Sequence, residues 1–393
     1  MKRIITAALL CISLFTPAAA RNLDEVAREI AAGSPALQAA RARYEALVAA
    51  DKAANSLPGP EIEGEYKWNA TEEGNRWGAG ISQAFDWPGA YAARSKAGAL
   101  RSQAYDDLCR AEYADRLLEA RTTLIDIAAA AEKLAILRKA ADNNSRLTEI
   151  YRVAFESQRV SLLDVRKLDL QAFATDSRIA GAETELDDAR SALSALTTEP
   201  TDGISIDALP AAEAPRALDA CMESARTANP SLAAALRLSD AARASVSAAR
   251  RAALPSFSLG YVHDFEENMH FNGLRVAIAL PTWSPRRAIT AAQAEATGAE
   301  FDQLDLSLRT TARLRAAHTT ASQLYDRVSR AAETFDTGTY PELLNKALDM
   351  GAINIFTYYE EYNAWLDACL EYVDLRATLA KANAELDRLA PVQ

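Results

Sequence analysis

The chain has 393 residues, of which 49% are hydrophobic and 25% charged, and its formal net charge at pH 7 is −11. This composition is typical of a folded protein and excludes extended disorder. The acidic balance argues against a nucleic-acid-binding protein, which needs a basic surface.

The first predicted element is a secretory signal at residues 1–20. Lys2 and Arg3 precede an apolar stretch from Ile4 to Phe15, and three alanines at 18–20 form a small-residue cleavage site. The apolar stretch is too short to span a bilayer, and no later run of about 18 apolar residues occurs. Cys11 lies inside the stretch, and its acylation, which would make the chain a lipoprotein, is the alternative.

A β-hairpin is predicted at about residues 60–87. The stretch PEIEGEYKW places charged side chains at every second position and apolar ones between them. This pattern is typical of a strand with one polar and one apolar face. The second strand of the hairpin, after a turn at 71–75, carries Trp77 and Trp87 on its apolar side.

A long helix follows the hairpin. Neither proline nor glycine occurs from Ala99 to Ala180, and Tyr91–Ala154 is rich in good helix formers. At about 1.5 Å per residue, such a helix is roughly 90 Å long. That length exceeds the helices of globular domains and indicates a coiled coil or a helical tube. A second helix follows a short turn near Ser157.

The second half of the sequence repeats the first in the same order. SPALQAARARYEAL matches NPSLAAALRLSDAA, and SQRVSLLDV matches MGAINIFTY, with an offset of roughly 193–197 residues throughout. We therefore divide the chain into a first repeat at 21–197, a connector at 198–216 and a second repeat at 217–393. The second hairpin, at about 256–283, has Arg275 on its polar side and Trp283 at the position of Trp87.

Each of the four predicted strands has about ten residues, the length of a tilted transmembrane strand. Unpaired strand edges are not tolerated in lipid, and barrels of this kind begin at about eight strands, so the chain must share a barrel with its copies. Two copies would give eight strands and three would give twelve. A pair of soluble amphipathic hairpins is the alternative. The residues predicted to line the pore are Glu61, Glu63, Glu65, Lys67 and Arg275. The residues predicted to face lipid as an aromatic girdle are Tyr66, Trp68, Trp77, Trp87 and Trp283.

These motifs, taken as an ordered and duplicated set, resemble the TolC-like outer membrane efflux proteins, the outer membrane factors. The resemblance covers nearly all of the mature length. It is carried by the paired helix starts, by LPGPEIEGEY and LPSFSLGY, by ISQAFDWPG and by the turn in MGAINIFTYYEEYNAWL. PGPEIEGEY with QAFDWPG is most similar to the branch that serves heavy-metal and cation efflux systems.

The resemblance implies a mainly α fold with a small β part, built from a duplicated helix, β-hairpin, long helix, helix repeat. It implies a homotrimer in which an α-helical barrel crosses the periplasm and joins a 12-stranded β-barrel in outer-membrane lipid, with four strands per chain. Such a duct exports substrates passively as the exit of a tripartite pump. Its partners are a periplasmic adaptor (membrane fusion) protein and an inner-membrane transporter of the RND type.

The resemblance also implies a periplasmic gate with an acidic ring near the turns between helices. By motif, Asp164 falls at the acidic position of the first turn, and Thr357 and Glu360 fall at the two acidic positions of the second. Thr357 departs from the family pattern. Gln158 replaces the turn glycine in the first copy, and Gly351 keeps it in the second. Ordinary solvated carboxylates are the alternative for Asp164 and Glu360.

No catalytic, metal or cofactor site is predicted. The three histidines show no metal-ligand spacing, and no nucleophile elbow, phosphate loop or paired-cysteine motif occurs. Cys109, Cys221 and Cys369 are interpreted as small buried residues rather than as a disulfide. The rival function is a soluble periplasmic coiled-coil adaptor or scaffold, which would carry one helical hairpin and compact β domains rather than two matched β-hairpins.

Overall fold

The computed structural model describes residues 22–68, 76–201, 204, 206, 208–266, 269–280, 284–334 and 339–391. The predicted signal, Cys11, Trp283 and the turn at 71–75 lie outside the described residues. The chain divides into two compact units. Unit 1 draws on Met1–Ser34, Leu117–Ala214 and Gln323–Lys381, and unit 2 draws on Pro35–Arg116, Pro215–Ser322 and Ala382–Gln393. Each unit combines segments of both predicted repeats, whose boundaries stay a prediction.

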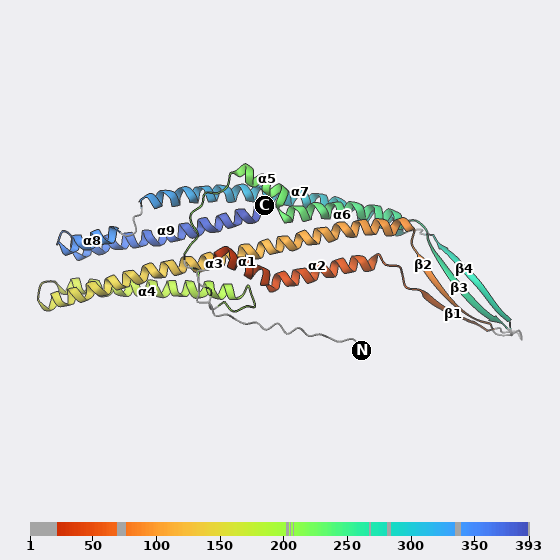
Figure 1. The fold of residues 1–393 in the computed structure, drawn as a ribbon, viewed down its shortest axis with the longest axis horizontal. Helices are drawn as coiled ribbons and strands as arrows, with labels where there is room; N and C mark the ends of the chain where they lie inside the picture. The colour runs from red at the N-terminus through yellow and green to blue at the C-terminus, as the bar shows by residue number, and fades with distance from the viewer. Residues whose placement is uncertain are drawn as a thin grey trace. The chain divides into compact units, whose positions relative to one another are not determined.

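The two halves of the chain present their elements in the same order: two short helices, a β-hairpin and long helices (Figure 1). The first half contains α1 (Leu23–Gly33), α2 (Pro35–Ala54), β1 (Glu61–Lys67), β2 (Arg76–Phe85), α3 (Pro88–Glu156) and α4 (Leu162–Ser194). The second half contains α5 (Leu218–Ala228), α6 (Pro230–Ala252), β3 (Ser256–Glu266), β4 (Met269–Ala279), α7 (Ser284–Thr334), α8 (Thr339–Asp349) and α9 (Ile355–Leu389).

The long helices differ between the halves. α3 runs for 69 residues without a break and includes the whole of the helix predicted at Tyr91–Ala154. In the second half, α7 and the short α8 stand where the first half has α3 alone. Pro341 lies in the first turn of α8, where a missing backbone N–H leaves no helical bond unmade. This second helix start was not predicted from the sequence.

Asn229 shows why the predicted NP motif begins a helix. Its side-chain Oδ1 accepts the backbone N–H groups of Ser231 at 2.9 Å and Leu232 at 3.1 Å, which would otherwise have no partner at the start of α6. Pro230 follows as the first helical residue, where its fixed φ suits the helix.

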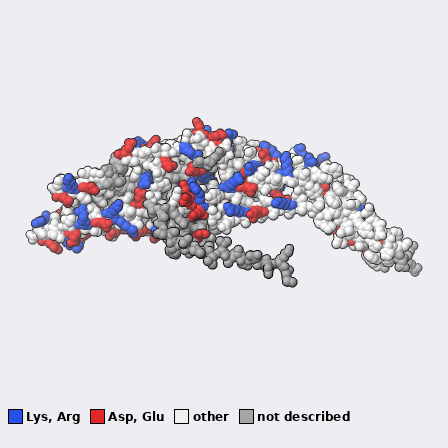
Figure 2. Space-filling view, viewed as in Figure 1, with Lys and Arg blue, Asp and Glu red and all other residues white. Residues whose placement is uncertain are grey.

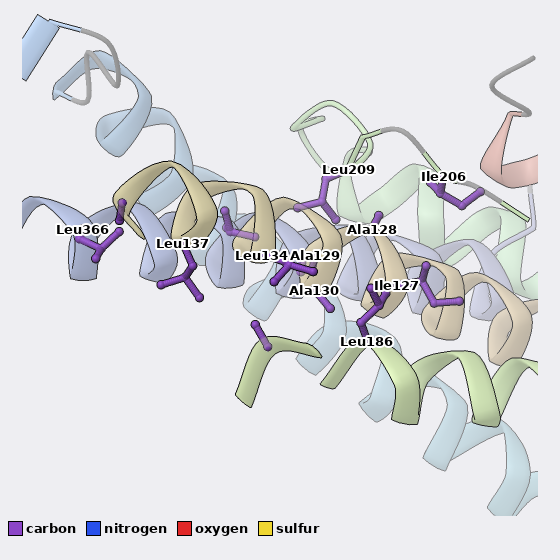
Figure 3. Close-up of a cluster of buried hydrophobic side chains, with 14 of the residues drawn as sticks. Ile127, Ala128, Ala129, Ala130, Leu134, Leu137, Leu186, Ile206, Leu209 and Leu366 are labelled. Atoms are coloured by element: carbon purple, nitrogen blue, oxygen red, sulfur yellow. The ribbon is translucent and has the colours of Figure 1, made fainter. Parts of the chain in front are cut away.

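The core of unit 1 is a seam of small and branched side chains between helices. Figure 3 shows Ile127, Leu134 and Leu137 of α3 gathered with Leu186 of α4 and Leu366 of α9, all almost fully buried. Three successive alanines of α3 are also buried there, because small side chains let neighbouring helices approach closely. Ile206 and Leu209 of the connector close the cluster.

Two of the three described cysteines are buried, as the sequence predicts, and Cys109 is only half-buried. Cys109, Cys221 and Cys369 are all free. Burial raises the pKa of the Cys369 thiol to about 11, so this thiol stays protonated at neutral pH. Cys221 packs with Leu314 of α7 and Leu386 of α9 in a second, smaller core that belongs to unit 2.

All four strands of unit 2 form one antiparallel sheet in the order β1-β2-β3-β4 (Figure 1). The predicted hairpins therefore join: β2 pairs with β3 over its whole length, from Arg76 opposite Glu266 to Phe85 opposite Phe257. The sequence predicts each hairpin from local alternation, but this central pairing connects segments about 180 residues apart and was not predicted.

Candidate functional site

The register of the sheet collects the apolar side chains of all four strands on one face, here called the apolar face. One row across it runs Ile62, Ile81, Tyr261, Leu274, each opposite the next. The two edge residues of this row are 83% and 80% exposed. In a single chain, this face thus leaves large hydrophobic side chains without cover, which soluble monomers rarely do.

Aromatic residues occupy both ends of the apolar face. At the hairpin-turn end, Tyr66 lies opposite Trp77, whose ring is 5.7 Å from that of Phe265. At the helical end, the rings of Phe85 and Phe257 stack 5.6 Å apart. Trp68 is 77% exposed just beyond β1, and Trp87 is 48% exposed between β2 and α3. The predicted girdle residues that the structure describes therefore lie at the two ends of the sheet.

The opposite face, here called the polar face, carries an ion pair between its two edge strands. Arg275 on β4 donates to Glu63 on β1, although β2 and β3 lie between them. Gly260 stands opposite Arg275 and Gly80 stands opposite Glu63, so the inner-strand residue next to each member of the pair has no side chain. In a flat sheet, the outer two of four strands are about 14 Å apart. The contact therefore requires the polar face to be concave.

The polar face carries charges of both signs. Arg76 pairs with Glu266 across β2 and β3, and Lys67 pairs with Glu65 at 2.9 Å. Among the described strand residues, this face holds five carboxylates and three cations, a net charge of −2 per chain. The carboxylates are Glu61, Glu63, Glu65, Asp264 and Glu266, and the cations are Lys67, Arg76 and Arg275. Figure 2 shows intermixed charge over the helices and a mostly uncharged sheet surface on the side in view.

Both edges of the sheet are open in the described part of the chain. β1 and β4 each pair with one neighbour only, and β4 is an eleven-residue strand exposed along nearly its whole length. Natural proteins protect long edge strands because unpaired backbone groups invite pairing with another chain. These edges are suited to pairing with a further copy of the same sheet.

The two inter-helix turns of unit 1 end their helices in the same way. After α3, the N–H of Gln158 donates to Phe155 O at 2.9 Å and the N–H of Arg159 donates to Ala154 O at 2.9 Å. After α8, Gly351 and Ala352 repeat both bonds. This Schellman pattern needs a left-handed residue, and Gln158 and Gly351 have φ values of 56° and 68°. The turn-glycine position is thus equivalent in both halves.

Substitutions of the left-handed residue in these two turns should change the free energy of unfolding in opposite directions. We expect Gln158→Gly to stabilise the protein by about 0.5–1 kcal/mol, because a side chain is strained at this φ. Gly351→Ala should destabilise by about 1 kcal/mol, although no atom lies within 4 Å of the added Cβ. Thermal melts followed by helical circular dichroism would measure both. Equal melting temperatures for wild type and both variants would contradict the shared conformation.

Asp164 has a structural role at the start of α4. Its Oδ2 accepts the N–H of Ser161 at 2.8 Å, while the Ser161 hydroxyl oxygen accepts the N–H of Asp164 at 3.2 Å. This reciprocal capping box stabilises the helix start. At α9 the same positions hold Asn354, which caps the helix, and Thr357, which donates its N–H to Asn354 at 3.0 Å. Glu360 is exposed on the next turn.

Behind these turns lies a buried tyrosine cluster on α9. Tyr358 and Tyr359 are fully buried, and Tyr362 is nearly so. The Tyr358 hydroxyl accepts from Asn143 of α3 at 2.8 Å and donates to Asn345 of α8 at 3.0 Å. It therefore links three helices. The adjacent Tyr359 hydroxyl is buried with no hydrogen-bond partner among the described residues. Burial raises the pKa of both phenols, so they stay neutral at physiological pH.

The two neighbouring tyrosines make a matched pair for a test. Tyr358→Phe should destabilise unit 1 by about 1–2 kcal/mol, because it breaks two hydrogen bonds that the buried hydroxyl makes with the half-buried amides of Asn143 and Asn345. Tyr359→Phe should be neutral or stabilising, because it removes a buried hydroxyl that makes no bond. Thermal melts of the two variants compare them directly, and a larger loss for Tyr359→Phe would contradict the network.

The predicted site residues fall into two groups. The structure brings Glu63 and Arg275 into contact and places Glu61, Glu65 and Lys67 on the same face. Asp164 and Glu360 stand near the start of two different helices, and no contact between them is recorded. Alternation along the strand also predicts Asp264 on the polar side, but neither Asp264 nor Glu266 was among the predicted pore-lining residues, although both lie on the polar face. Their alternate spacing on the strand was the available signal.

Within the described residues, no helix is long and apolar enough to cross a membrane. The same residues contain no group of three or more histidine, cysteine or carboxylate side chains able to hold a metal ion.

No protein-family model matches the sequence, and no curated protein matches it. The structure is similar to solved outer membrane channels. The Campylobacter jejuni CmeC outer membrane channel is 15% identical, with 98% of this chain and 93% of that chain covered and a TM-score of 0.77. The outer membrane protein VceC of Vibrio cholerae is 16% identical, with 94% of each chain covered and a TM-score of 0.69. The open state of the Neisseria gonorrhoeae MtrE outer membrane channel is 17% identical, with coverage of 93% and 90% and a TM-score of 0.66.

These similarities show that the chain has the fold of outer membrane channels. They confirm the predicted fold class, a mainly helical chain with a small four-stranded β part. The resemblance to TolC-like outer membrane factors, read from short motifs, is thereby confirmed at the level of the fold.

Proposed function

We propose that this chain is the outer-membrane channel of a tripartite efflux pump and exports substrates passively from the periplasmic side. The observation that carries the proposal is the sheet of unit 2. It combines an apolar face with aromatic ends, a concave polar face that carries charges, and two open edges. Lipid would cover the apolar face, and water would fill the space enclosed by the polar face. Further copies of the chain would pair with the two edges.

A homotrimer satisfies these demands. Three copies supply twelve strands, and β4 of each copy would pair with β1 of the next, which leaves no edge exposed to lipid. Two copies would supply eight strands, whose interior is filled by side chains. Only the larger barrel leaves room for a water-filled pore. The long helices of the three copies would continue the duct into the periplasm.

The gate of this duct is proposed at the inter-helix turns. Three copies of Asp164 and Glu360 would concentrate negative potential at a narrow opening. The capping role of Asp164 is compatible with this, since the cap holds its carboxylate at the turn. The duct performs no chemistry of its own, needs no cofactor, and works with a periplasmic adaptor and an inner-membrane transporter of the RND type.

Conductance in planar lipid bilayers tests the channel directly. The detergent-purified mature protein should produce discrete current steps and favour cations, because the polar face is net acidic. A boiled sample serves as the control. A folded sample that inserts no conducting units would overturn the proposal and favour the soluble adaptor or scaffold.

The narrower assignment, to heavy-metal and cation efflux, rests on the motifs PGPEIEGEY and QAFDWPG. Deletion of the gene in its native host should then increase sensitivity to heavy-metal salts more than sensitivity to organic antibiotics. The reverse order would place the duct in a drug-exporting system.

A further inference from the structure

A polar cluster interrupts the apolar face near the hairpin-turn end of β3 and β4. It consists of Tyr261, His263, His270 and Asn272, whose alternate positions place them on this face. His263 lies opposite Asn272, and His270 lies opposite Phe265. The two histidines are therefore diagonal neighbours on adjacent strands. Asp264 and Glu266 point to the polar face, so no carboxylate of β3 enters the cluster.

A chain of hydrogen bonds orients the His263 ring. Tyr261 donates its hydroxyl to Asn272 Oδ1 at 2.5 Å, and the same oxygen lies 2.9 Å from His263 Nδ1. A carbonyl oxygen only accepts, so Nδ1 carries the proton and Nε2 presents a lone pair. His270 Nδ1 lies 3.3 Å from that Nε2. The bond from the second ring nitrogen to a carbonyl is the arrangement that prepares a histidine for metal binding.

The spacing of these two ring nitrogens suits one metal ion that would replace the contact between them. Zinc–imidazole bonds are about 2.1 Å long, and two nitrogens 3.3 Å apart then subtend about 104° at a shared ion, close to tetrahedral. We propose that His263 Nε2 and His270 Nδ1 chelate one divalent late transition-metal ion, of the Zn²⁺, Ni²⁺ or Cu²⁺ class, which imidazole prefers. His270 then moves its proton from Nδ1 to Nε2. The pair lies beside Trp77 and Phe265 at the aromatic end of the sheet, where a membrane-inserted sheet meets water, and water completes the coordination.

Aromatic side chains flank the pair. The Trp77 ring lies 6.2 Å from that of His263, and the Phe265 ring lies 5.0 Å from that of His270. These ring contacts favour the orientations in which the two imidazoles face each other. The ion would cross-link β3 to β4 close to their last pair, Glu266 with Met269, at the end of the hairpin far from the helices. The inference does not require the channel function.

Copper and zinc titrations of the full-length mature protein, without a histidine tag, test the proposal. We expect one Zn²⁺ per chain by calorimetry, and a Cu²⁺ paramagnetic resonance spectrum with two nitrogen ligands. Cu²⁺ should also quench the fluorescence of Trp77, which contacts His263. His263→Ala and His270→Ala should each weaken Zn²⁺ binding more than tenfold, and Asn272→Ala, which removes the orienting oxygen, should weaken it about tenfold.

The third histidine supplies the control. His318 lies on α7 and contacts the Arg216 carbonyl at 2.9 Å, so His318→Gln should leave metal affinity unchanged. Oligomer mass and circular dichroism verify that each variant folds. If a histidine variant does not fold, Asn272→Ala still tests the site. Zinc affinity unaffected by His263→Ala and His270→Ala, or absence of any stoichiometric binding, would overturn the proposal.

Discussion

Replacing Arg275 by glutamate is expected to raise the cation preference of the channel several-fold. The substitution changes the net charge of the polar face from −2 to −4 per chain, and three copies of each site would face the same water-filled space. Glu63 would lose its partner and face a second carboxylate, so both would attract counter-ions. Pore selectivity follows the charge of the residues that line the pore. Reversal potentials in a salt gradient should therefore shift toward the value of an ideally cation-selective pore.

Two further variants make this prediction specific. Arg275→Lys keeps the charge and should keep the wild-type reversal potential, while Arg275→Gln should give an intermediate value. Unchanged selectivity in Arg275→Glu would mean that the polar face does not line the conducting path, even if the protein forms pores.

The second large effect is expected at the proposed gate. Asp164→Asn combined with Glu360→Gln should weaken block by multivalent cations about tenfold or more, because it removes six carboxylates from a trimeric opening. An amide at 164 still offers an oxygen to the N–H of Ser161, so the helix start is largely retained. Single-channel recordings with a trivalent cation on the periplasmic side would measure the block.

Ser161→Ala separates the cap from the charge. This variant removes the hydroxyl that accepts the N–H of Asp164 but keeps the carboxylate, so it should lower the melting temperature while leaving the block unchanged. If Ser161→Ala altered the block as strongly as the double variant, the effect would come from helix fraying instead of charge.

Local patterns predicted the features that depend on neighbours in sequence. Alternation with a period of two decides which face a strand residue takes. It predicts Glu63 and Arg275 on the polar sides of their strands, and the structure places both on the polar face. The motif around Gln158 and Gly351 likewise indicated equivalent turns. The capping box at Ser161 and Asp164 was also readable from its spacing but was overlooked, because Asp164 was interpreted only as a gate residue.

Pairings between distant segments could not be predicted in the same way. Nothing local indicates that β2 pairs with β3, or that Gly80 and Gly260 stand beside the ion pair of the polar face. The His263–His270 contact depends on the register of β3 and β4, and a seven-residue separation matches no familiar metal motif. The interruption between α7 and α8 did have a local signal, since Gly338 and Pro341 flank the start of α8.

Three copies of this chain are proposed to share one barrel in the outer membrane. Cell fractionation followed by light scattering of the detergent-extracted protein tests this assembly. We expect the protein in the outer-membrane fraction, in particles with three times the mass of the mature chain. A monomer released with the soluble periplasmic fraction would contradict the shared barrel.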